Sequence, residues 1–468
     1  MPGGAGEVVT IGTPQLGDRS YLVHDGNVAL VIDPQRDIDR VQAAARQADV
    51  RITHVAETHV HNDYATGGVQ LARESGASYL MNGTDDVAFD REPVADGDEL
   101  AVGSLTVRVV ATPGHTHNHV SYLVSSGDEQ AVFSGGSLLY GSVGRTDLVD
   151  PADTDQLTHA QYRSVRRLAT QASDQAVLYP THGFGSFCSS GPATVVDSAT
   201  IGDQKRDNHA LTDDDEDHFA ETLIAGLSAY PAYYAHIGEL NRTGAEPVDL
   251  SLPEPLDTGE LRSRLRNGQW VVDLRNRVAF ADDHLEGTVS VEYGDGTNFT
   301  TFLGWTLPWG APLTVVGGRD EVEAAVRDLS RIGIDQPRVG IGDRPEQLVE
   351  GHPTRSYPHV GWAELLEERR ADGEPVVLDV RRDDEYALAH LDGALHVPLH
   401  SLLERMDEVP RRTLWVHCGS GYRAGIAASL LQRAGHDVVH VDADWSDAAD
   451  TGLPVVSGDG RQGGSLRS

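Results

Sequence analysis

The first two hundred residues alternate short apolar runs with turn signals and with segments of helical periodicity. Apolar runs of strand length occur at 28–32, 52–56, 105–110 and 131–133. Apolar positions repeat with helical spacing at 41–47 and 156–170. Strand-rich segments interleaved with helices in this way predict an α/β or layered αββα domain.

A change of pattern marks the end of this first domain. Residues 203–243 are helical and polar, and they include the acidic run 213–217, for which we expect a solvated helix start. The Pro-rich stretch 246–256 then has the composition of an interdomain linker. We therefore place the first domain at 1–245.

An internal repeat follows the linker. Asp273-Leu274-Arg275 aligns with Asp379-Val380-Arg381, and the same offset continues without a gap. It pairs Phe280 with Tyr386, His284-Leu285 with His390-Leu391, Gly287 with Gly393, and Val291 with Val397. This agreement predicts two homologous α/β domains, at 257–350 and 357–460, followed by a flexible tail at 461–468.

Length and composition agree with this division. A chain of 468 residues has room for about three domains. Hydrophobic residues make up 39% of it, which is enough to fill globular cores and excludes global disorder. No charge-free run approaches the roughly 18 residues of a membrane span, so no membrane partner is expected.

The charge is strongly acidic. There are 72 acidic residues against 37 basic ones, a net charge of -35, and the single lysine is Lys205. Such a surface repels phosphates and excludes nucleic acid as a partner. Asp-rich, lysine-poor composition resembles that of proteins from salt-loving organisms, although a merely acidic cytosolic protein is the plain alternative. The two cysteines are too few for a secreted disulfide framework, so we expect a reducing, cytoplasmic location.

The second repeat contains the pattern of a reactive cysteine. The apolar run 413–417 leads to Cys418, a Gly-rich loop and Arg423, and the segment 424–431 has helical periodicity. Backbone N–H groups, a helix N-terminus and a guanidinium all favour the thiolate, which is the nucleophilic form.

This loop, together with Asp379-Val380-Arg381, Glu385-Tyr386 and residues 390–394, resembles the rhodanese family. In that family a six-residue loop from Cys to Arg cradles a cysteine persulfide. The resemblance implies that Cys418 accepts sulfane sulfur and passes it to another thiol, while Arg423 stabilises the charged loop. A buried, inert cysteine is the plain alternative, and a Cys-based phosphatase would need a loop one residue longer.

The first repeat lacks this nucleophile. Its corresponding run, 312–316, leads into Gly317-Gly318-Arg319. This copy cannot carry a persulfide, and we expect a structural or docking role for it; a third domain that merely fills space is the plain alternative.

Histidines gather in three segments of the first domain. His59, His61 and Asp63 follow the strand predicted at 52–56, and alternate side chains there can converge on one point. His115 lies in Thr112-Pro113-Gly114-His115, and His182 follows the run 177–181. Histidines merely scattered over core and surface are the plain alternative.

These motifs together resemble the metallo-β-lactamase fold. Tyr64 stands where the dizinc hydrolases carry a further His ligand, so one metal ion is expected. Residues 133–139 and 144–148 resemble persulfide dioxygenases, which use one ferrous iron held by two His and an Asp, with positions left for O₂ and substrate sulfur. The resemblance implies that His59 and His115 are iron ligands, that Arg145 lies near the substrate, and that His182 is a site histidine.

The sequence departs from that family at the third ligand, because Gly136 stands where the Asp is expected. Three outcomes remain open. His61 completes a three-histidine iron site; Asp63, His182 or Asp147 substitutes; or the site binds metal weakly and oxidises nothing.

Cys188 lies shortly after His182, where fusion-type persulfide dioxygenases place a thiol that could relay sulfur; a buried, inert cysteine is an equal alternative.

The sequence thus predicts an αββα metallo-β-lactamase fold followed by two α/β rhodanese domains. We expect one Fe(2+) per chain rather than zinc. The expected partners are a low-molecular-weight persulfide or thiol, thiosulfate and O₂, and assembly into a homo-oligomer is compatible with the sequence. The expected activity is oxidation of the persulfide to sulfite or thiosulfate, coupled to sulfur transfer through Cys418. The alternatives are a metal-degenerate sulfurtransferase or sulfur carrier, and a glyoxalase II-like thioester hydrolase.

Overall fold

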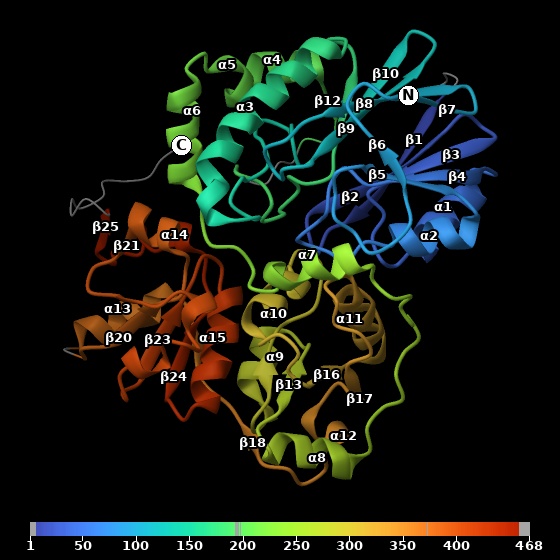
Figure 1. Cartoon of the computed structure of the whole chain (residues 1–468). Coiled ribbons are helices and arrows are strands. Elements are labelled where there is room, and N and C mark those ends of the chain that lie inside the picture. Colours follow the sequence, from blue (N-terminus) through green and yellow to red (C-terminus); the bar gives the residue numbers. More distant parts are fainter. Residues whose placement is uncertain (1–5, 192–195, 197, 372, 458–468) are drawn as a thin grey trace. The chain divides into compact units, whose positions relative to one another are not determined.

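The computed structural model describes residues 6–191, 196, 198–371 and 373–457, so the predicted tail at 461–468 lies outside the described residues. The chain forms two compact units (Figure 1). The first comprises Met1–Leu250 with Arg327–Asp335, and the second comprises Ser251–Val326 with Gln336–Ser468.

The first unit contains two six-stranded sheets. One sheet has the strand order β1-β2-β3-β4-β5-β6, with antiparallel pairing up to β3 and parallel pairing from β3 onward. Its strands are β1 (Glu7–Thr13), β2 (Asp18–His24), β3 (Val28–Ile32), β4 (Arg51–Ala56), β5 (Ser78–Asn82) and β6 (Glu92–Val94). The runs expected at 28–32 and 52–56 are therefore strands.

The other sheet has the order β12-β11-β10-β9-β8-β7. Its strands are β7 (Glu99–Val102), β8 (Leu105–Ala111), β9 (Val120–Ser126), β10 (Glu129–Gly135), β11 (Val177–Pro180) and β12 (Ala199–Thr200). The parallel pair β10–β11 brings the loops after both strands to one edge of the sheet. That edge carries Gly136 and His182.

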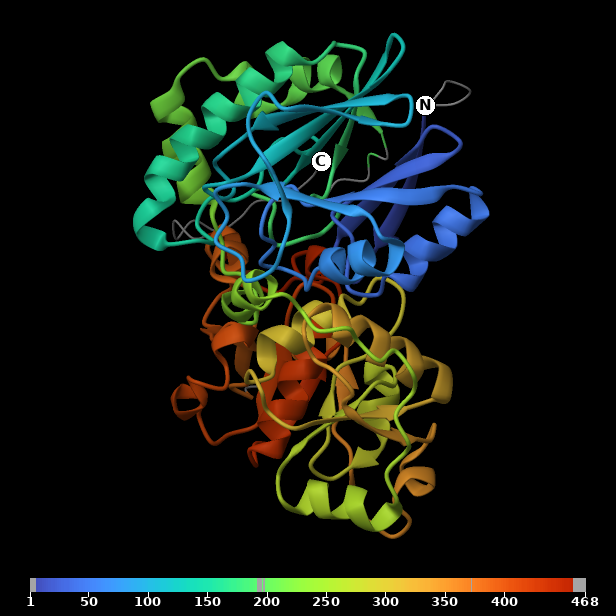
Figure 2. The same cartoon turned by 45° about the vertical axis from the view of Figure 1, so that its right-hand side comes forward.

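Helices cover the outer faces of the two sheets (Figure 2). Apolar residues of α1 (Asp39–Gln47) and α2 (Gly68–Ser75) pack on the first sheet. Those of α3 (Thr154–Gln171) and α6 (Glu216–Gly226) pack on the second. A third cluster, which includes Tyr21, Leu30, Val107 and Phe133, fills the space between the sheets. These layers confirm the predicted αββα arrangement.

Four further helices belong to the described residues in 6–250 of this unit. They are η1 (Pro151–Asp153), α4 (Ile201–Asp207), α5 (His209–Thr212) and α7 (Tyr234–Thr243). The acidic run 213–217 is the predicted helix start, because the Asp215 carboxylate accepts hydrogen bonds from the backbone N–H groups of Asp217 and His218 at the beginning of α6.

The second unit contains two parallel sheets that correspond strand by strand. The sheet of the first repeat has the order β15-β13-β16-β17, and that of the second has β22-β20-β23-β24-β19. The first comprises β13 (Trp270–Asp273), β15 (Val289–Ser290), β16 (Leu313–Gly317) and β17 (Arg338–Ile341). The second comprises β19 (His359–Val360), β20 (Val376–Asp379), β22 (Leu395–His396), β23 (Leu414–His417) and β24 (Val438–Val441). The extra edge strand β19 distinguishes the second repeat.

Side-chain contacts also recur at the predicted offset. The Arg275 guanidinium donates to the backbone oxygen of Asp283 at 2.9 Å, and the Arg381 guanidinium donates to that of Ala389 at 2.8 Å. Each arginine also pairs with the Asp two residues before it. The internal repeat of the sequence is therefore a repeat in three dimensions.

Helices and short strands complete the second unit. The helices are α8 (Thr258–Arg266), α9 (Arg277–Asp282), α10 (Phe299–Thr306), α11 (Arg319–Arg331), α12 (Pro345–Leu348), α13 (Trp362–Arg370), α14 (Asp383–Leu388), α15 (Tyr422–Arg433), η2 (Leu399–Ser401), η3 (Met406–Glu408) and η4 (Trp445–Asp447). The end of α11, from Arg327, belongs to the first unit. The two-stranded pairs are β14 (His284–Leu285) with β18 (Thr354–Arg355), and β21 (Ala389–Leu391) with β25 (Val455–Ser457). Among the described residues, no helix has the length and apolar character needed to cross a bilayer.

Candidate metal centre and reactive cysteine

Buried histidines converge at the loops that follow the strands of the first unit. His59 and His61 follow β4, His115 lies between β8 and β9, and His182 follows β11. The ring centroid of His59 lies 4.0 Å from that of His61, 4.8 Å from that of His115 and 5.5 Å from that of His182. The three sequence segments therefore meet at one point, as the motifs predict.

His59, His115 and His182 form one group of donors. One ligand atom of each lies within 4.8 Å of those of the others. Their Nδ1 atoms are engaged, by the Thr58 hydroxyl at 2.9 Å, the Arg145 backbone oxygen at 2.7 Å and the Asp18 carboxylate at 2.9 Å, respectively. The Nε2 atoms of His59 and His182 are buried and, within the described part of the chain, have no hydrogen-bond partner. Orphaned imidazole nitrogens facing one another fit a metal ion.

Charge agrees with ligation directly for His59 and His115, whereas His182 must release a proton to ligate. Burial lowers the pKa of His59 well below its usual value and lowers the pKa of His115 to about 3, so both are neutral imidazoles, the ligating form. Burial also acts to lower the pKa of His182, but the carboxylates of Asp63 and Asp18 outweigh it and raise that pKa to about 10. The Asp18–His182–Asp63 contacts hold the His182 ring in place.

His61 has different surroundings. Its Nε2 lies 3.0 Å from the Tyr64 hydroxyl and 3.3 Å from both the Asp33 and Glu57 carboxylates. Burial lowers the pKa of His61, yet these two carboxylates outweigh burial and raise it to about 9. His61 also belongs to a second donor group, with Asp63 and His182. His61 therefore either completes that second group or serves as the counter-ion of two buried acids.

Gly136 is in close contact with His115. An ideal Cβ at position 136 would lie 2.1 Å from His115 Cδ2. The Gly136 N–H donates to His119 Nε2 at 3.0 Å, and the preceding Gly135 has a φ of +54°. The turn that would present an Asp in the persulfide dioxygenases is thus closed around a glycine, and His182 is the third imidazole beside His59 and His115.

Sequence reasoning missed several residues that support this centre. His119 is fully buried, and its Nδ1 contacts the Thr112 hydroxyl. Asp33 accepts hydrogen bonds from the Thr58 backbone and hydroxyl at 2.7 and 2.8 Å, and Thr58 in turn contacts His59. His119 could have been found as the second His after His115; Asp33 carries only the signal of an acid directly after a buried strand.

Arg145 and Asp147 pair with each other. The Arg145 Nε donates to Asp147 at 2.7 Å, a second nitrogen donates to the Ser228 backbone oxygen at 2.6 Å, and the guanidinium lies over the Tyr230 ring. Only 2% of the Arg145 side chain is exposed. The backbone oxygen of Arg145 orients His115, whereas Asp147 is not among the converging donors found in the described residues.

Cys188 is fully buried near the second donor group. Burial raises the pKa of its thiol well above the usual value, and the charges of Asp63 and Asp18 raise it further. The side chain is therefore a thiol rather than a thiolate, and its backbone oxygen accepts the Arg145 N–H at 2.9 Å.

Cys418 lies at the turn from β23 into α15, as predicted. Gly421, at φ +84°, turns the loop into the helix. The Arg423 guanidinium pairs with the Glu385 carboxylate through two contacts, of 2.5 and 2.7 Å. Burial acts to lower the pKa of Arg423, but Glu385 and the charge of Cys418 outweigh it and raise the pKa. A permanently cationic group beside a backbone loop at a helix N-terminus fits an anionic sulfur.

The corresponding loop of the first repeat is closed by its own side chain. Arg319 follows Gly317-Gly318, and the Gly318 N–H donates to the Glu321 carboxylate at 3.0 Å. A backbone donor that would face an anion in an active copy is therefore already occupied.

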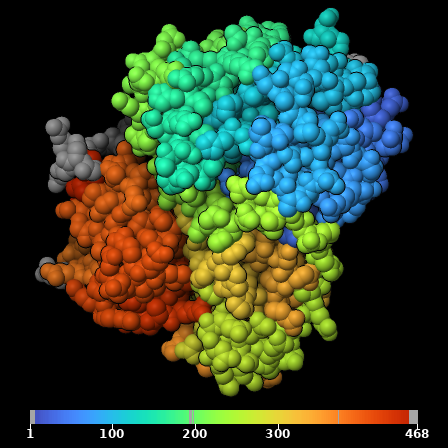
Figure 3. Space-filling view, viewed as in Figure 1, coloured from blue at the N-terminus to red at the C-terminus, as the bar shows by residue number. Residues whose placement is uncertain are grey.

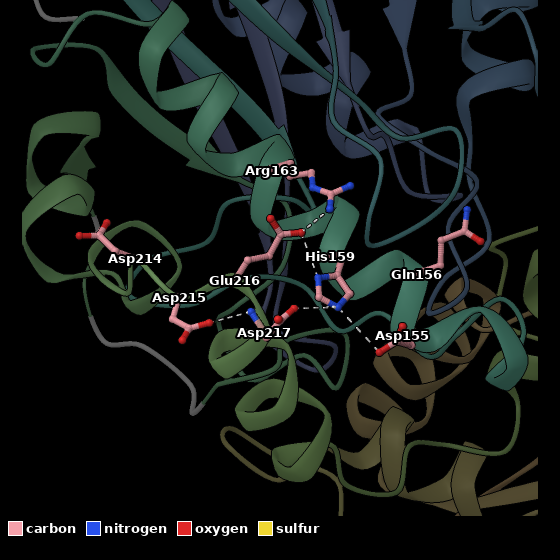
Figure 4. A pocket seen from close by; sticks show the side chains of 8 residues that line it. All are labelled: Asp155, Gln156, His159, Arg163, Asp214, Asp215, Glu216 and Asp217. Atoms are coloured by element: carbon pink, nitrogen blue, oxygen red, sulfur yellow. Dashed lines mark hydrogen bonds and ion pairs between the residues drawn. The ribbon is translucent and has the colours of Figure 1, made fainter.

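A wide acidic pocket lies elsewhere on the first unit (Figure 4). Its volume is about 850 Å³. His159 Nδ1 contacts Glu216 at 3.0 Å, and Arg163 contacts the same carboxylate at 2.7 Å. The side chains of Asp155 and Asp217 are 81% and 89% exposed, so this is a solvated acidic surface and not a buried centre.

Comparison with known families matches this geometry. The sequence matches the metallo-beta-lactamase superfamily over residues 16–182 and the rhodanese-like domain family over residues 363–450. The chain joins a metallo-β-lactamase-fold domain to a C-terminal rhodanese domain. The first match spans the histidine cluster and ends at His182, and the second includes Cys418 and Arg423.

A solved structure and curated relatives extend the comparison. A metallo-beta-lactamase from Staphylococcus aureus is 26% identical, with a TM-score of 0.66, over 72% of this chain and all of the other. Because the first unit holds little more than half of the chain, that likeness extends into the second unit. An atrochrysone carboxyl ACP thioesterase of Paecilomyces divaricatus is 29% identical over 36% of this chain, and a hydroxyacylglutathione hydrolase of Francisella philomiragia is 31% identical over 35%. The chain covers only 50% and 62% of those two relatives.

Proposed function

We propose that the chain is a sulfur-metabolism enzyme with two activities. The metallo-β-lactamase-fold domain oxidises a low-molecular-weight persulfide with O₂ to sulfite, and Cys418 of the rhodanese domain transfers sulfane sulfur. The observation that carries the proposal is the convergence of three imidazoles, two of them with orphaned Nε2 atoms, in the same chain as a cysteine loop built to hold an anionic sulfur.

The donor set supports one ferrous ion held by His59, His115 and His182. Imidazole ligands suit iron and zinc alike, and a three-nitrogen set leaves coordination positions open. We propose that His182 replaces the carboxylate that Gly136 lacks, because a side chain at 136 would collide with His115. Bound there, ferrous iron would supply redox activity and vacant positions for O₂ and sulfur.

The chain's own residues orient this set. Thr58, the Arg145 backbone oxygen and Asp18 engage the three Nδ1 atoms, so that the Nε2 lone pairs face inward. In the overall reaction, a persulfide, O₂ and water give a thiol, sulfite and two protons. The outer sulfur loses four electrons to O₂, and its bond to the inner sulfur breaks.

Sulfur transfer needs no oxidant. The Cys418 thiolate attacks the outer sulfur of the donor, and the donor's S–S bond breaks with its electron pair leaving on sulfite (from thiosulfate) or on a thiolate (from a persulfide). An acceptor thiolate or cyanide then attacks the persulfide sulfur and regenerates the Cys418 thiolate. Arg423 stabilises the loop during both steps, since Glu385 fixes its guanidinium.

The test is to purify the protein anaerobically, measure iron and zinc, and follow O₂ uptake with glutathione persulfide as the probe. We expect close to one iron per chain, with O₂ uptake and sulfite release. Cys418→Ser is expected to abolish thiosulfate:cyanide sulfur transfer without changing iron content. Transfer that survives in Cys418→Ser would refute the assignment of the nucleophile.

Two variants separate the proposed ligand from its neighbour. His182→Ala is expected to lower iron content at least tenfold. His61→Ala is expected to retain iron but to unfold at lower temperature, because it leaves Asp33 and Glu57 without their buried partner. Loss of iron in His61→Ala with retention in His182→Ala would reverse the ligand assignment.

The curated relatives favour one competing function, a metal-dependent thioester hydrolase. Such hydrolases rely on a two-metal site, and here Tyr64 replaces a ligating histidine while Gly136 replaces the bridging acid. Two zinc ions per chain with thioesterase turnover would support this alternative. Sulfur transfer with neither metal nor O₂ uptake would instead support a sulfur carrier with a degenerate metal domain.

A further inference from the structure

The two repeats of the second unit meet at the Cys418 loop. A cavity of about 400 Å³ is lined on one side by Arg277, Glu292 and residues 295–297 of the first repeat. Its other side is lined by Ser420, Tyr422 and residues 442–444 of the rhodanese domain. In the space-filling view the yellow surface of the first repeat adjoins the red surface of the rhodanese domain (Figure 3). The repeat without a cysteine therefore reaches the reactive loop of the other.

Arg277 makes the central contacts of this junction. Its Nε donates to the Asp442 carboxylate at 2.7 Å, and Nη1 donates to Glu292 at 2.8 Å. Its Nη2 lies 3.5 Å from the backbone oxygen of Ser420, inside the loop. Only 25% of the Arg277 side chain is exposed, so water competes weakly for its two carboxylate contacts.

The partners of Arg277 hold the loop itself. The Tyr422 hydroxyl donates to the Glu292 backbone oxygen at 2.9 Å. The Asp442 carboxylate lies against Gly421, since an ideal Cβ at that position would be 1.9 Å from Asp442 Oδ1. Three consecutive residues of the six-residue loop, 420–422, thus touch Arg277 or groups that it binds.

We infer that the first repeat is a positioning partner of Cys418. Arg277, through Asp442 and Glu292, fixes residues 420–422 in the conformation that directs the loop's backbone N–H groups toward the Cys418 sulfur. These donors stabilise a thiolate or persulfide only when correctly oriented. The inference rests on the proposed role of Cys418, and it gives the repeat without a nucleophile a definite task.

The test compares Arg277→Ala with Arg433→Ala in the full chain. Arg433 of the rhodanese domain also contacts the first repeat, at the backbone oxygen of Gln269 (3.3 Å) and the Trp270 ring, but at the far end of α15 from the loop. The readouts are the rate of Cys418 alkylation by iodoacetamide, resolved by mass spectrometry of its peptide, the pH profile of that rate, and kcat and KM for thiosulfate:cyanide transfer.

Arg277→Ala is expected to slow alkylation and lower kcat by about tenfold, and to move the midpoint of the alkylation profile to higher pH. Arg433→Ala is expected to leave all three near wild type. Tyr422→Phe, which removes one hydroxyl and is compatible with folding, is expected to slow alkylation about threefold. Equal effects of Arg277→Ala and Arg433→Ala, or wild-type alkylation in both Arg277→Ala and Tyr422→Phe, would overturn the inference.

Alkylation separates this inference from the proposed function. A wild-type protein without sulfur transfer would refute the proposed function, while a slower alkylation in Arg277→Ala alone would still support positioning. Normal transfer by wild type together with unchanged alkylation in Arg277→Ala and Tyr422→Phe would refute positioning alone.

Discussion

Gly136 and His115 show how closely a single residue is fitted at the candidate metal centre. A methyl group at 136 would lie within the van der Waals radius of the His115 ring, and that ring is fixed at Nδ1 by the Arg145 backbone oxygen. The ring cannot move away without losing this contact. A small substitution at 136 should therefore act on the metal site before it acts on the fold.

Gly136→Ala is expected to lower iron content at least tenfold, because displacement of the His115 ring removes one ligand from the set. Metal analysis of the anaerobically purified variant measures this. Gly226→Ala is the matched control, since nothing lies within 4 Å of an added Cβ there. Equal iron in the two variants would contradict the fitted contact.

His417, which precedes Cys418, is expected to make the stability of the protein depend on pH. It is fully buried, and burial lowers its pKa to about 4; Asp379 acts to raise that pKa, whereas Arg381 and Arg369 act to lower it. Because the folded pKa lies below the unfolded value of about 6.5, the unfolded chain binds the proton first as pH falls. The contribution to stability is therefore present at pH 7 and is lost below about pH 6.5.

The expected loss between pH 7 and pH 5 is about 2 kcal/mol from this one group. Denaturant unfolding of wild type and His417→Gln at both pH values measures this loss. The change in unfolding free energy between pH 7 and pH 5 is compared in the two proteins, and the difference is the contribution of His417. An equal change in unfolding free energy in the two proteins would show that His417 takes up a proton in the folded protein.

At the scale of elements, α6 begins at Glu216, inside the acidic run 213–217. Asp215 caps the helix through the N–H groups of Asp217 and His218, both at 3.1 Å, and the helix packs Phe219 and Leu223 on the second sheet. The run of like charges is thus tolerated because one of its carboxylates satisfies two otherwise unpaired donors.

Asp215→Ala is expected to destabilise the first unit by about 1 kcal/mol through loss of this cap. Thermal unfolding measures the change. Asp214→Ala, one residue earlier and 96% exposed at its side chain, is expected to stay within about 0.5 kcal/mol of wild type. A larger loss in Asp214→Ala than in Asp215→Ala would contradict the assignment of the cap.

Elements with a strong local pattern could be predicted from the sequence. The runs at 28–32 and 105–110 are strands, and 156–170 lies within α3, because their apolar spacing matches one period throughout. The internal repeat could also be predicted, because paired positions carry similar residue types that make the same contacts. His284 stacks on Phe280 as His390 stacks on Tyr386, each pair with ring centroids 3.9 Å apart.

The ligand set could be narrowed but not completed from the sequence. The sequence spacing makes His59 and His61 equally good candidates for a metal ligand, and only their tertiary contacts distinguish the two. Asp33 and Glu57 engage His61, while Asp18, 164 residues from His182, orients the third imidazole. Contacts of this kind leave no periodic pattern in the sequence, because they depend on which strand ends meet at one edge of the sheet.

At the scale of the whole molecule, acidic groups outnumber the cations available to pair with them. The pocket of Figure 4 is an example, with five carboxylates around one histidine and one arginine. Salt shortens the screening length from about 10 Å at 0.1 M to about 3 Å at 1 M, which relieves this repulsion in the folded state.

The midpoint of thermal unfolding is therefore expected to rise with KCl between 0.1 M and 2 M. An increase of roughly 5 °C corresponds to about 2 kcal/mol of relieved repulsion in domains of this size. Scanning calorimetry over a KCl series measures it. A midpoint that stays flat or falls would show that arginine–carboxylate pairs outweigh the repulsion.

Glu321 limits what a single substitution could do in the loop of the first repeat. Since its carboxylate already receives the Gly318 N–H, a cysteine introduced at this turn would find one backbone donor already bound to a neighbouring acid. Sulfur chemistry there would require at least two changes together, neither of which confers activity alone. Under the positioning role proposed above, the first repeat would affect sulfur transfer through the surface that it presents to the Cys418 loop and not through a loop of its own.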